Sequence, residues 1–202
     1  MSDGKRILLI ISGGIAAYKS LELIRELKLH DINVRCILTE AGSQFITPLS
    51  AEALTGDKVY RDLFSLTDEN EMGHIELSRD ADLVVIAPAT ANIIAKMRAG
   101  ITDDLVTTAL IATDKPVLIA PSMNVRMWEH ASTQSNMVEL KKRGIHVIGP
   151  EIGDMACGEH GMGRMSEPSS IAQIINELLQ NNSDTSANQS IITNNLKRLV
   201  GR

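Results

Sequence analysis

The stretch Lys5–Ile11, which reads KRILLII, decides the fold, and the turn Ser12-Gly13-Gly14 follows it directly. An unbroken apolar run is typical of a strand buried on both faces of a parallel sheet, because a half-exposed strand alternates apolar and polar residues. Residues at helical spacing then run from Ile15 to His30. A strand, a glycine turn and a helix in this order predict the first unit of an α/β fold.

The same order repeats along the chain. Apolar runs predict four further strands, at 32–38, 83–87, 116–120 and 145–148. Helical patterns separate most of these runs. Strands that alternate with helices imply right-handed crossovers and a parallel sheet covered on both faces. We therefore expect a three-layer, doubly wound α/β fold, Rossmann-like or flavodoxin-like, that binds ligands at the carboxyl ends of its strands.

Three segments depart from this pattern. Residues 57–73 show no clear periodicity. Residues 151–165 are rich in Gly and Met without periodicity, and residues 153–163 within them are predicted to form a flexible loop. A last helix is expected to end near Leu179. Residues 181–190 are almost wholly polar, as in flexible linkers. We expect one folded domain over 1–180, followed by a tail over 181–202 of the kind that leads into a further domain.

The composition of the 202-residue chain excludes several classes of protein. A formal net charge of -5 argues against a nucleic-acid binder, and an aromatic content of 2% leaves no platform for stacking bases. No apolar run reaches the ~18 residues of a membrane span, and the first strand follows no signal peptide. We expect a cytoplasmic protein without membrane partners. Cys36 and Cys157 lack the spacing of a metal site, so no metal is expected.

Polar or small residues follow several predicted strands, and each also has an ordinary explanation. Gly13-Gly14 suits a bound phosphate or a plain tight turn, although the dinucleotide pattern GxGxxG is absent. Thr90-Ala91-Asn92 could hold a cofactor or simply cap a helix, and Asn124 could donate to a carboxylate or cap a helix. His74 is a candidate base or a solvated side chain.

The two cysteines differ in their surroundings. Cys36 lies in an apolar strand and is predicted to be core filler. Cys157 lies in a segment that Gly158, Gly161 and Gly163 make mobile. A thiol with an ordinary pKa of ~8.5 is mostly protonated at neutral pH, so Cys157 can deliver a proton.

Four motifs occur in order. They are SGGIAAYK at 12–19, GHIELSRDADLVVIAPATANIIAKMRAGITDDLVTT at 73–108, PSMNVRMW at 121–128 and ACGEHGMGRM at 156–165. Together they resemble the homo-oligomeric flavin-containing cysteine decarboxylases over residues 5 to about 180. Within that family the motifs are most similar to the branch that acts on 4′-phosphopantothenoylcysteine in coenzyme A biosynthesis.

The resemblance implies FMN as the cofactor. The residues that it places against FMN are Gly13, Gly14, Ile15, Thr39, Thr90, Ala91, Asn92, Ile93 and Ser122. Small side chains and backbone N–H groups dominate this set. The aromatic ring system that the chain lacks would therefore come from the flavin.

The resemblance also implies the catalytic and substrate-binding residues. It makes His74 the active-site histidine, Asn124 the ligand of the substrate carboxylate and Cys157 the proton donor of the reducing step. Residues 151–165 become a substrate-recognition flap, in which Asp154, Met155 and Ala156 line the substrate.

The family reaction explains these requirements. The substrate thiol loses a proton and its β-carbon gives a hydride to oxidised FMN, so that the resulting thioaldehyde can accept the electrons released with carbon dioxide. An enethiolate remains, and return of the hydride with a proton from Cys157 gives 4′-phosphopantetheine. A neutral amide at Asn124 orients the carboxylate without stabilising its charged ground state as an arginine would.

The family resemblance also implies an oligomeric state, and three alternative functions remain to be considered. The family implies a site between protomers of a trimer, and some members assemble four trimers into a dodecamer. A peptidyl-cysteine decarboxylase of the same family and a non-catalytic flavin-binding regulatory subunit are the nearer rivals. A nicotinamide dehydrogenase using Gly13-Gly14 and Glu40 is the third, disfavoured by its missing glycine spacing.

Overall fold

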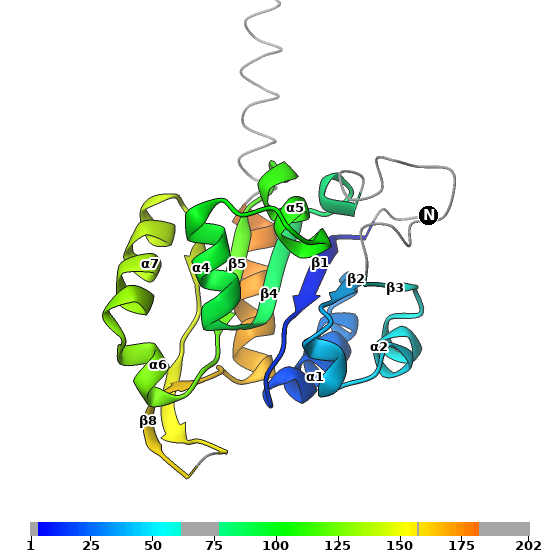
Figure 1. The fold of residues 1–202 in the computed structure, drawn as a ribbon. Coiled ribbons are helices and arrows are strands. Elements are labelled where there is room, and N and C mark those ends of the chain that lie inside the picture. Colours follow the sequence, from blue (N-terminus) through cyan, green and yellow to red (C-terminus); the bar gives the residue numbers. More distant parts are fainter. Residues whose placement is uncertain (1–3, 62–76, 157, 182–202) are drawn as a thin grey trace, which may run out of the picture.

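The computed structural model describes residues 4–61, 77–156 and 158–181, and these form a six-stranded parallel sheet between helices (Figure 1). The strand order is β3-β2-β1-β4-β5-β6. The strands are β1 (Arg6–Ile11), β2 (Asn33–Leu38), β3 (Val59–Tyr60), β4 (Leu83–Ala89), β5 (Val117–Pro121) and β6 (His146–Val147). This is the order of the Rossmann fold, so the doubly wound α/β expectation is confirmed and the flavodoxin-like order is excluded.

Helices cover both faces of the sheet, as the three-layer prediction requires (Figure 1). One face packs against α1 (Ala17–Leu29), α2 (Pro48–Thr55) and the helix of residues 168–181. The other packs against α4 (Ala91–Ala99), α5 (Leu105–Ala112) and α7 (Ala131–Lys142). Two shorter elements, the 3₁₀ helix η1 (Gly42–Gln44) and helix α6 (Val125–Glu129), follow β2 and β5.

The central strand β1 shows why its sequence is apolar throughout. Ile7, Leu9 and Ile11 belong to the core under α1, and Leu8 and Ile10 belong to the core under α4. None of the five has any exposed surface. Because β1 pairs with β2 on one side and β4 on the other, every position along it is enclosed.

The helix boundaries follow local capping signals in the sequence. Gly56 and Gly100 adopt left-handed backbone after α2 and α4, as helix C-terminal glycines do. Helix α5 starts after Asp104, because Asp104 and Thr107 exchange side-chain-to-backbone hydrogen bonds in a capping box. The chain between β5 and Arg143 forms two separate helices, α6 and α7, because His130 between them has an extended backbone.

The prediction of a flexible loop over 153–163 is wrong at both ends of that segment. Strands β7 (Glu151–Asp154) and β8 (His160–Arg164) pair as an antiparallel hairpin. Glycines at 161 and 163 remove the alternation of apolar and polar residues that announces a strand. Strand β3 likewise occupies part of the segment expected to be irregular.

Some expectations fall on residues that the structure does not describe. His74, Cys157 and the tail after residue 181 are among them. Within the described ranges, no helix combines the length and the apolar character needed to cross a bilayer.

Candidate active site

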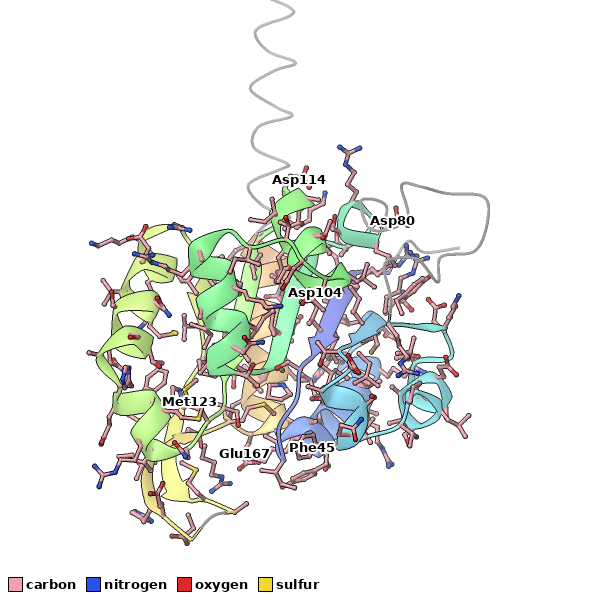
Figure 2. The ribbon with its side chains drawn as sticks, viewed as in Figure 1. Phe45, Asp80, Asp104, Asp114, Met123 and Glu167 are labelled. Carbon is pink, nitrogen blue, oxygen red and sulfur yellow. The ribbon has the colours of Figure 1, made fainter. Side chains whose placement is uncertain are left out.

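The loops that follow β1, β2, β4 and β5 lie at one edge of the sheet, because all four strands are parallel. This edge therefore brings together the residues expected to contact FMN. They are Gly13, Gly14 and Ile15 after β1, Thr39 after β2, Thr90, Ala91, Asn92 and Ile93 after β4, and Ser122 after β5. In Figure 2 the labelled Phe45, Met123 and Glu167 mark this end of the molecule, and Asp80, Asp104 and Asp114 mark the opposite end.

The β1 and β2 loops touch where only glycine fits. A Cβ at Gly13 would lie 2.6 Å from the Cβ of Ala41, and one at Gly42 would lie 2.7 Å from the Ile11 carbonyl oxygen. Gly14 has a φ of +152° and faces open space, with no atom within 4 Å of a Cβ placed there. No side chain caps the start of α1 after Ala16. An uncapped helix start beside an open glycine is a ready site for a phosphate.

Buried serines connect the β1 loop and helix α1 to β4. The Ser12 hydroxyl donates to the Pro88 carbonyl at 2.6 Å, and the Ser20 hydroxyl donates to the Ala87 carbonyl at 2.7 Å. Both bonds are buried, which makes them costly to break. Sequence reasoning did not single out either serine, although Ser12 follows β1 directly.

Two of the expected cofactor residues are also local caps. The Thr39 hydroxyl accepts from the Gly42 N–H at 2.9 Å, and the Thr90 hydroxyl accepts from the Ile93 N–H at 3.3 Å at the start of α4. The ordinary explanation of Thr90 as a helix cap is therefore confirmed. A hydroxyl that accepts one hydrogen bond can still donate another, so capping leaves both side chains able to contact a ligand.

Asn124 caps α6 in a way that leaves its amide group available. Its Oδ1 accepts from the Met127 N–H at 2.8 Å, while the two Nδ2 hydrogens remain as donors. Asn124 lines a pocket of about 380 Å³, together with Ala91, Arg126, Met127, His130 and Thr133. This volume lies within the about 300–1,000 Å³ of ordinary ligand sites. The pocket joins the β4 loop to the β5 loop.

The β7–β8 hairpin lies against the β5 loop. The Met123 N–H donates to the Gly163 carbonyl at 3.0 Å, and a Cβ at Gly163 would overlap the Met123 carbonyl. A Cβ at Gly161 would lie 2.9 Å from a methyl group of Val125. The glycines of β8 therefore allow the hairpin to reach both neighbours of Asn124 in the chain.

The expected substrate residues Asp154, Met155 and Ala156 stand at the tip side of this hairpin. The Asp154 carboxylate pairs with His160 Nδ1 at 2.8 Å across the two strands, in an exposed position. The Met155 N–H donates to the Glu159 carbonyl at 2.8 Å. Asp154 therefore already has a side-chain partner, which favours backbone over side-chain contacts with a substrate.

An ion pair connects the base of the hairpin to α1. Lys19 is 8% exposed, and its Nζ donates to the Met165 carbonyl at 3.2 Å and to the Glu167 carboxylate at 3.0 Å. The hydrogen bond from Lys19 holds the pKa of Glu167 below its ordinary value. Glu167 also contacts Arg164 at the end of β8. Sequence reasoning missed this connection; the only signal was a lysine within the SGGIAAYK motif.

Of the three expected catalytic residues, only Asn124 belongs to the part of the chain that the structure describes. His74 and Cys157 fall outside it. Cys36 is fully buried in β2, as expected of core filler. Among the described residues, no group of three or more His, Cys, Asp or Glu side chains could hold a metal ion.

Known proteins resemble this chain over most of its length. Residues 1–180 match a protein-family model described as Flavoprotein. The chain is 46% identical over 177 residues to the coenzyme A biosynthesis bifunctional protein CoaBC of Vibrio vulnificus, covering 88% of this chain and 44% of that protein. It is 48% identical over 171 residues to CoaBC of Escherichia coli K12, covering 85% and 42%. The chain thus spans less than half the length of these relatives.

Solved structures show the same likeness. A PPC decarboxylase mutant complexed with pantothenoylaminoethenethiol superposes with a TM-score of 0.78 at 34% identity, covering 88% of this chain and 99% of that one. The FMN-binding protein AtHal3 gives a TM-score of 0.76 at 34% identity, covering 88% and 98%.

Proposed function

The chain belongs to the flavoprotein family, and from this premise we propose that it is an FMN-dependent decarboxylase. Its substrate is the cysteine moiety of 4′-phosphopantothenoylcysteine, and its product is 4′-phosphopantetheine of coenzyme A biosynthesis. The observation that carries the proposal is the free amide of Asn124, which lines a pocket shared with Ala91 of the β4 loop and whose chain neighbours contact the hairpin. The CoaBC proteins and the PPC decarboxylase among its relatives support the same reaction.

The residues at the sheet edge suit FMN. Open space at Gly14 and the uncapped start of α1 accommodate a phosphate, and the Thr39 and Thr90 hydroxyls can contact polar groups of the cofactor. The relative AtHal3 is itself named as an FMN-binding protein. Bound FMN would supply the redox chemistry of the reaction, as a reversible hydride acceptor next to the substrate carbon that carries the thiol.

Asn124 orients the carboxylate that departs. Because its Oδ1 is held by Met127, the amide is fixed with its N–H groups directed away from the helix. An uncharged donor binds the carboxylate without adding the stabilisation that a cation would give to the ground state. The side chain therefore positions the group and does not oppose its loss.

The hairpin covers the reacting centre. Strand β8 is held against the β5 loop by Met123, and the residues directly after β8 are held to α1 by Lys19, so residues 155–156 belong to a hairpin with a fixed base. We assign the proton of the reducing step to Cys157, and the organisation of the substrate thiol to His74, from their places in the sequence motifs.

We further propose that the protein is a cytoplasmic homo-oligomer, a trimer that can assemble further into a dodecamer. Large apolar side chains are exposed around the cofactor loops, and a second copy would cover them. These side chains are Ile15, Tyr18, Phe45 and Leu49. Residues 181–202 are proposed as a tail that leads into a further domain, as in the longer CoaBC relatives.

The decisive experiment is turnover with a variant that keeps the helix cap. Asn124→Asp preserves an oxygen for the Met127 N–H but replaces the amide donor by a negative charge that repels the substrate carboxylate. We expect wild-type protein to form 4′-phosphopantetheine and carbon dioxide, and Asn124→Asp to lose at least about a hundredfold in kcat/KM while retaining bound flavin. Unchanged turnover in the variant, or a wild-type protein that leaves the substrate intact, would contradict the proposal.

A further inference from the structure

The pocket beside Asn124 contains positively polarised groups that carboxylate binding does not use. Arg126 lines it, is exposed, and makes none of the ion pairs found among the described residues. An unpaired guanidinium in a ligand pocket is a fork of donors suited to a carboxylate or a phosphate.

His130 presents a second donor to the same pocket. Its Nδ1 accepts from the Ser132 N–H at 3.2 Å at the start of α7. A neutral imidazole that accepts at Nδ1 carries its proton on Nε2, so Nε2 is a donor. His130 therefore offers a hydrogen bond to an anion without needing to be charged.

Thr133 adds a hydroxyl at the positive end of a helix. It lies in the first turn of the 12-residue helix α7, is 7% exposed, and lines the pocket. Its hydroxyl makes no hydrogen bond within the described residues. The Gln134 side chain donates to the Trp128 carbonyl at 2.6 Å across the junction between α6 and α7. A hydroxyl that lines a pocket at a helix N-terminus and has no partner among the described residues can donate to an anionic ligand.

We propose that Arg126, His130 and Thr133 form the subsite for the phosphate monoester of the substrate, in the pocket where Asn124 holds the carboxylate. This assignment rests on the proposed function and deepens it. A phosphate is the better match than the departing carboxylate, because a guanidinium on that carboxylate would stabilise the ground state. The subsite also explains selectivity, since a peptide ending in cysteine carries no phosphate and would leave these groups unpaired.

Binding of two stable probes to the flavin-loaded protein tests the subsite without decarboxylation. We expect 4′-phosphopantothenate to bind at least about tenfold more tightly than pantothenate in isothermal titration calorimetry. Arg126→Gln should abolish most of this difference in affinity between the two probes. His130→Asn, which keeps a capping side chain, should reduce it. Arg25→Gln, the same change on an exposed residue of α1 on the other face of the sheet, should leave the ratio unchanged.

Several results would overturn the subsite. Equal affinity for the two probes in wild-type protein would do so, as would a ratio that survives Arg126→Gln. If Arg126→Gln binds FMN more weakly but keeps the same ratio of affinities for the two probes, the Arg126 guanidinium contacts the phosphate of the cofactor instead.

Kinetics separate this inference from the proposed function. If wild-type protein binds the phosphorylated probe selectively but decarboxylates neither 4′-phosphopantothenoylcysteine nor pantothenoylcysteine, the subsite stands and the proposed function fails. If it decarboxylates both with equal kcat/KM, the function stands and the subsite fails.

Discussion

Cys36 shows how burial determines what a single residue can do. Its thiol is fully buried in β2, and burial, with the nearby negative charge of Asp57, raises its pKa from 9.0 to about 12. The thiolate is thus disfavoured in the folded protein. Cys36 is unsuited to act as a nucleophile or as an acid at neutral pH.

A pH prediction follows for this residue. Because the folded pKa lies above the unfolded value, the unfolded chain releases the thiol proton first, and stability is lost as pH rises from 9.0 towards 12. The stability advantage of wild-type protein over Cys36→Ala should shrink by up to about 1.4 kcal/mol per pH unit in that window. Urea unfolding of both proteins at pH 8 and pH 10.5 measures this. Parallel pH profiles for the two proteins would contradict it.

At the scale of elements, the β7–β8 hairpin depends on close backbone approach. Gly163 has a φ of +143°, and its backbone bonds to Met123 where a Cβ would overlap the Met123 carbonyl. Lys19, through Glu167, holds the base of the same hairpin. The hairpin is therefore fixed at its base and at the β5 loop, next to Asn124.

Gly163→Ala should displace β8 from the β5 loop. We expect a loss of more than about tenfold in kcat/KM for decarboxylation, since small misplacements near a reacting group are costly. Gly56→Ala is the matched control: its φ is +72°, no atom lies within 4 Å of its Cβ, and it follows α2. The control should lower the free energy of unfolding by about 1 kcal/mol and keep kcat/KM. Equal kinetic effects of the two substitutions would argue against a positioning role for β8.

At the scale of the whole molecule, the loops proposed to contact FMN come from both halves of the sheet. Gly13 and Thr39 belong to the β1–β2 half, and Thr90 and Ser122 belong to the β4–β5 half. The halves meet at β1 and β4, where the strand order changes direction. FMN bound there should bind the folded chain and not the unfolded one.

FMN should therefore raise the thermal midpoint of flavin-free protein. At a hundredfold excess over the Kd the stabilisation is about 2.7 kcal/mol, which corresponds to roughly 5–10 °C for a domain of this size. Riboflavin, which lacks the phosphate, should give a smaller shift, because it does not use the Gly14 loop. Differential scanning fluorimetry compares the two. Identical midpoints with FMN, with riboflavin and without flavin would contradict the assigned cofactor loops.

Much of the fold could be predicted from local pattern. The run at Lys5–Ile11 indicated a central strand, and the strands at β2, β4 and β5 followed from runs of the same kind. Strand β3 and the β7–β8 hairpin could not be predicted. Strand β3 has only two residues, which is too short to show a pattern. The glycines of β8 interrupt the alternation of apolar and polar residues that indicates a strand.

The candidate site could be predicted in outline. Topology alone places Gly13, Thr39, Thr90 and Asn124 at one edge, because parallel strands end together. Whether Thr90 and Asn124 cap helices or face a ligand could not be separated by pattern. The structure shows that both are caps with donor groups to spare.

The sequence by itself determined that this is a parallel α/β protein with its ligand edge at the strand ends, because buried strands must be apolar and turns beside ligands need glycine. Only the tertiary structure decided three further features. These are the Rossmann strand order, the packing of β8 against the β5 loop and the ion pair between Lys19 and Glu167. The physical reason is the sequence separation of the interacting residues. Periodicity reports which side of an element is buried, but the choice of partner is made by shape and hydrogen bonding between segments far apart in the chain.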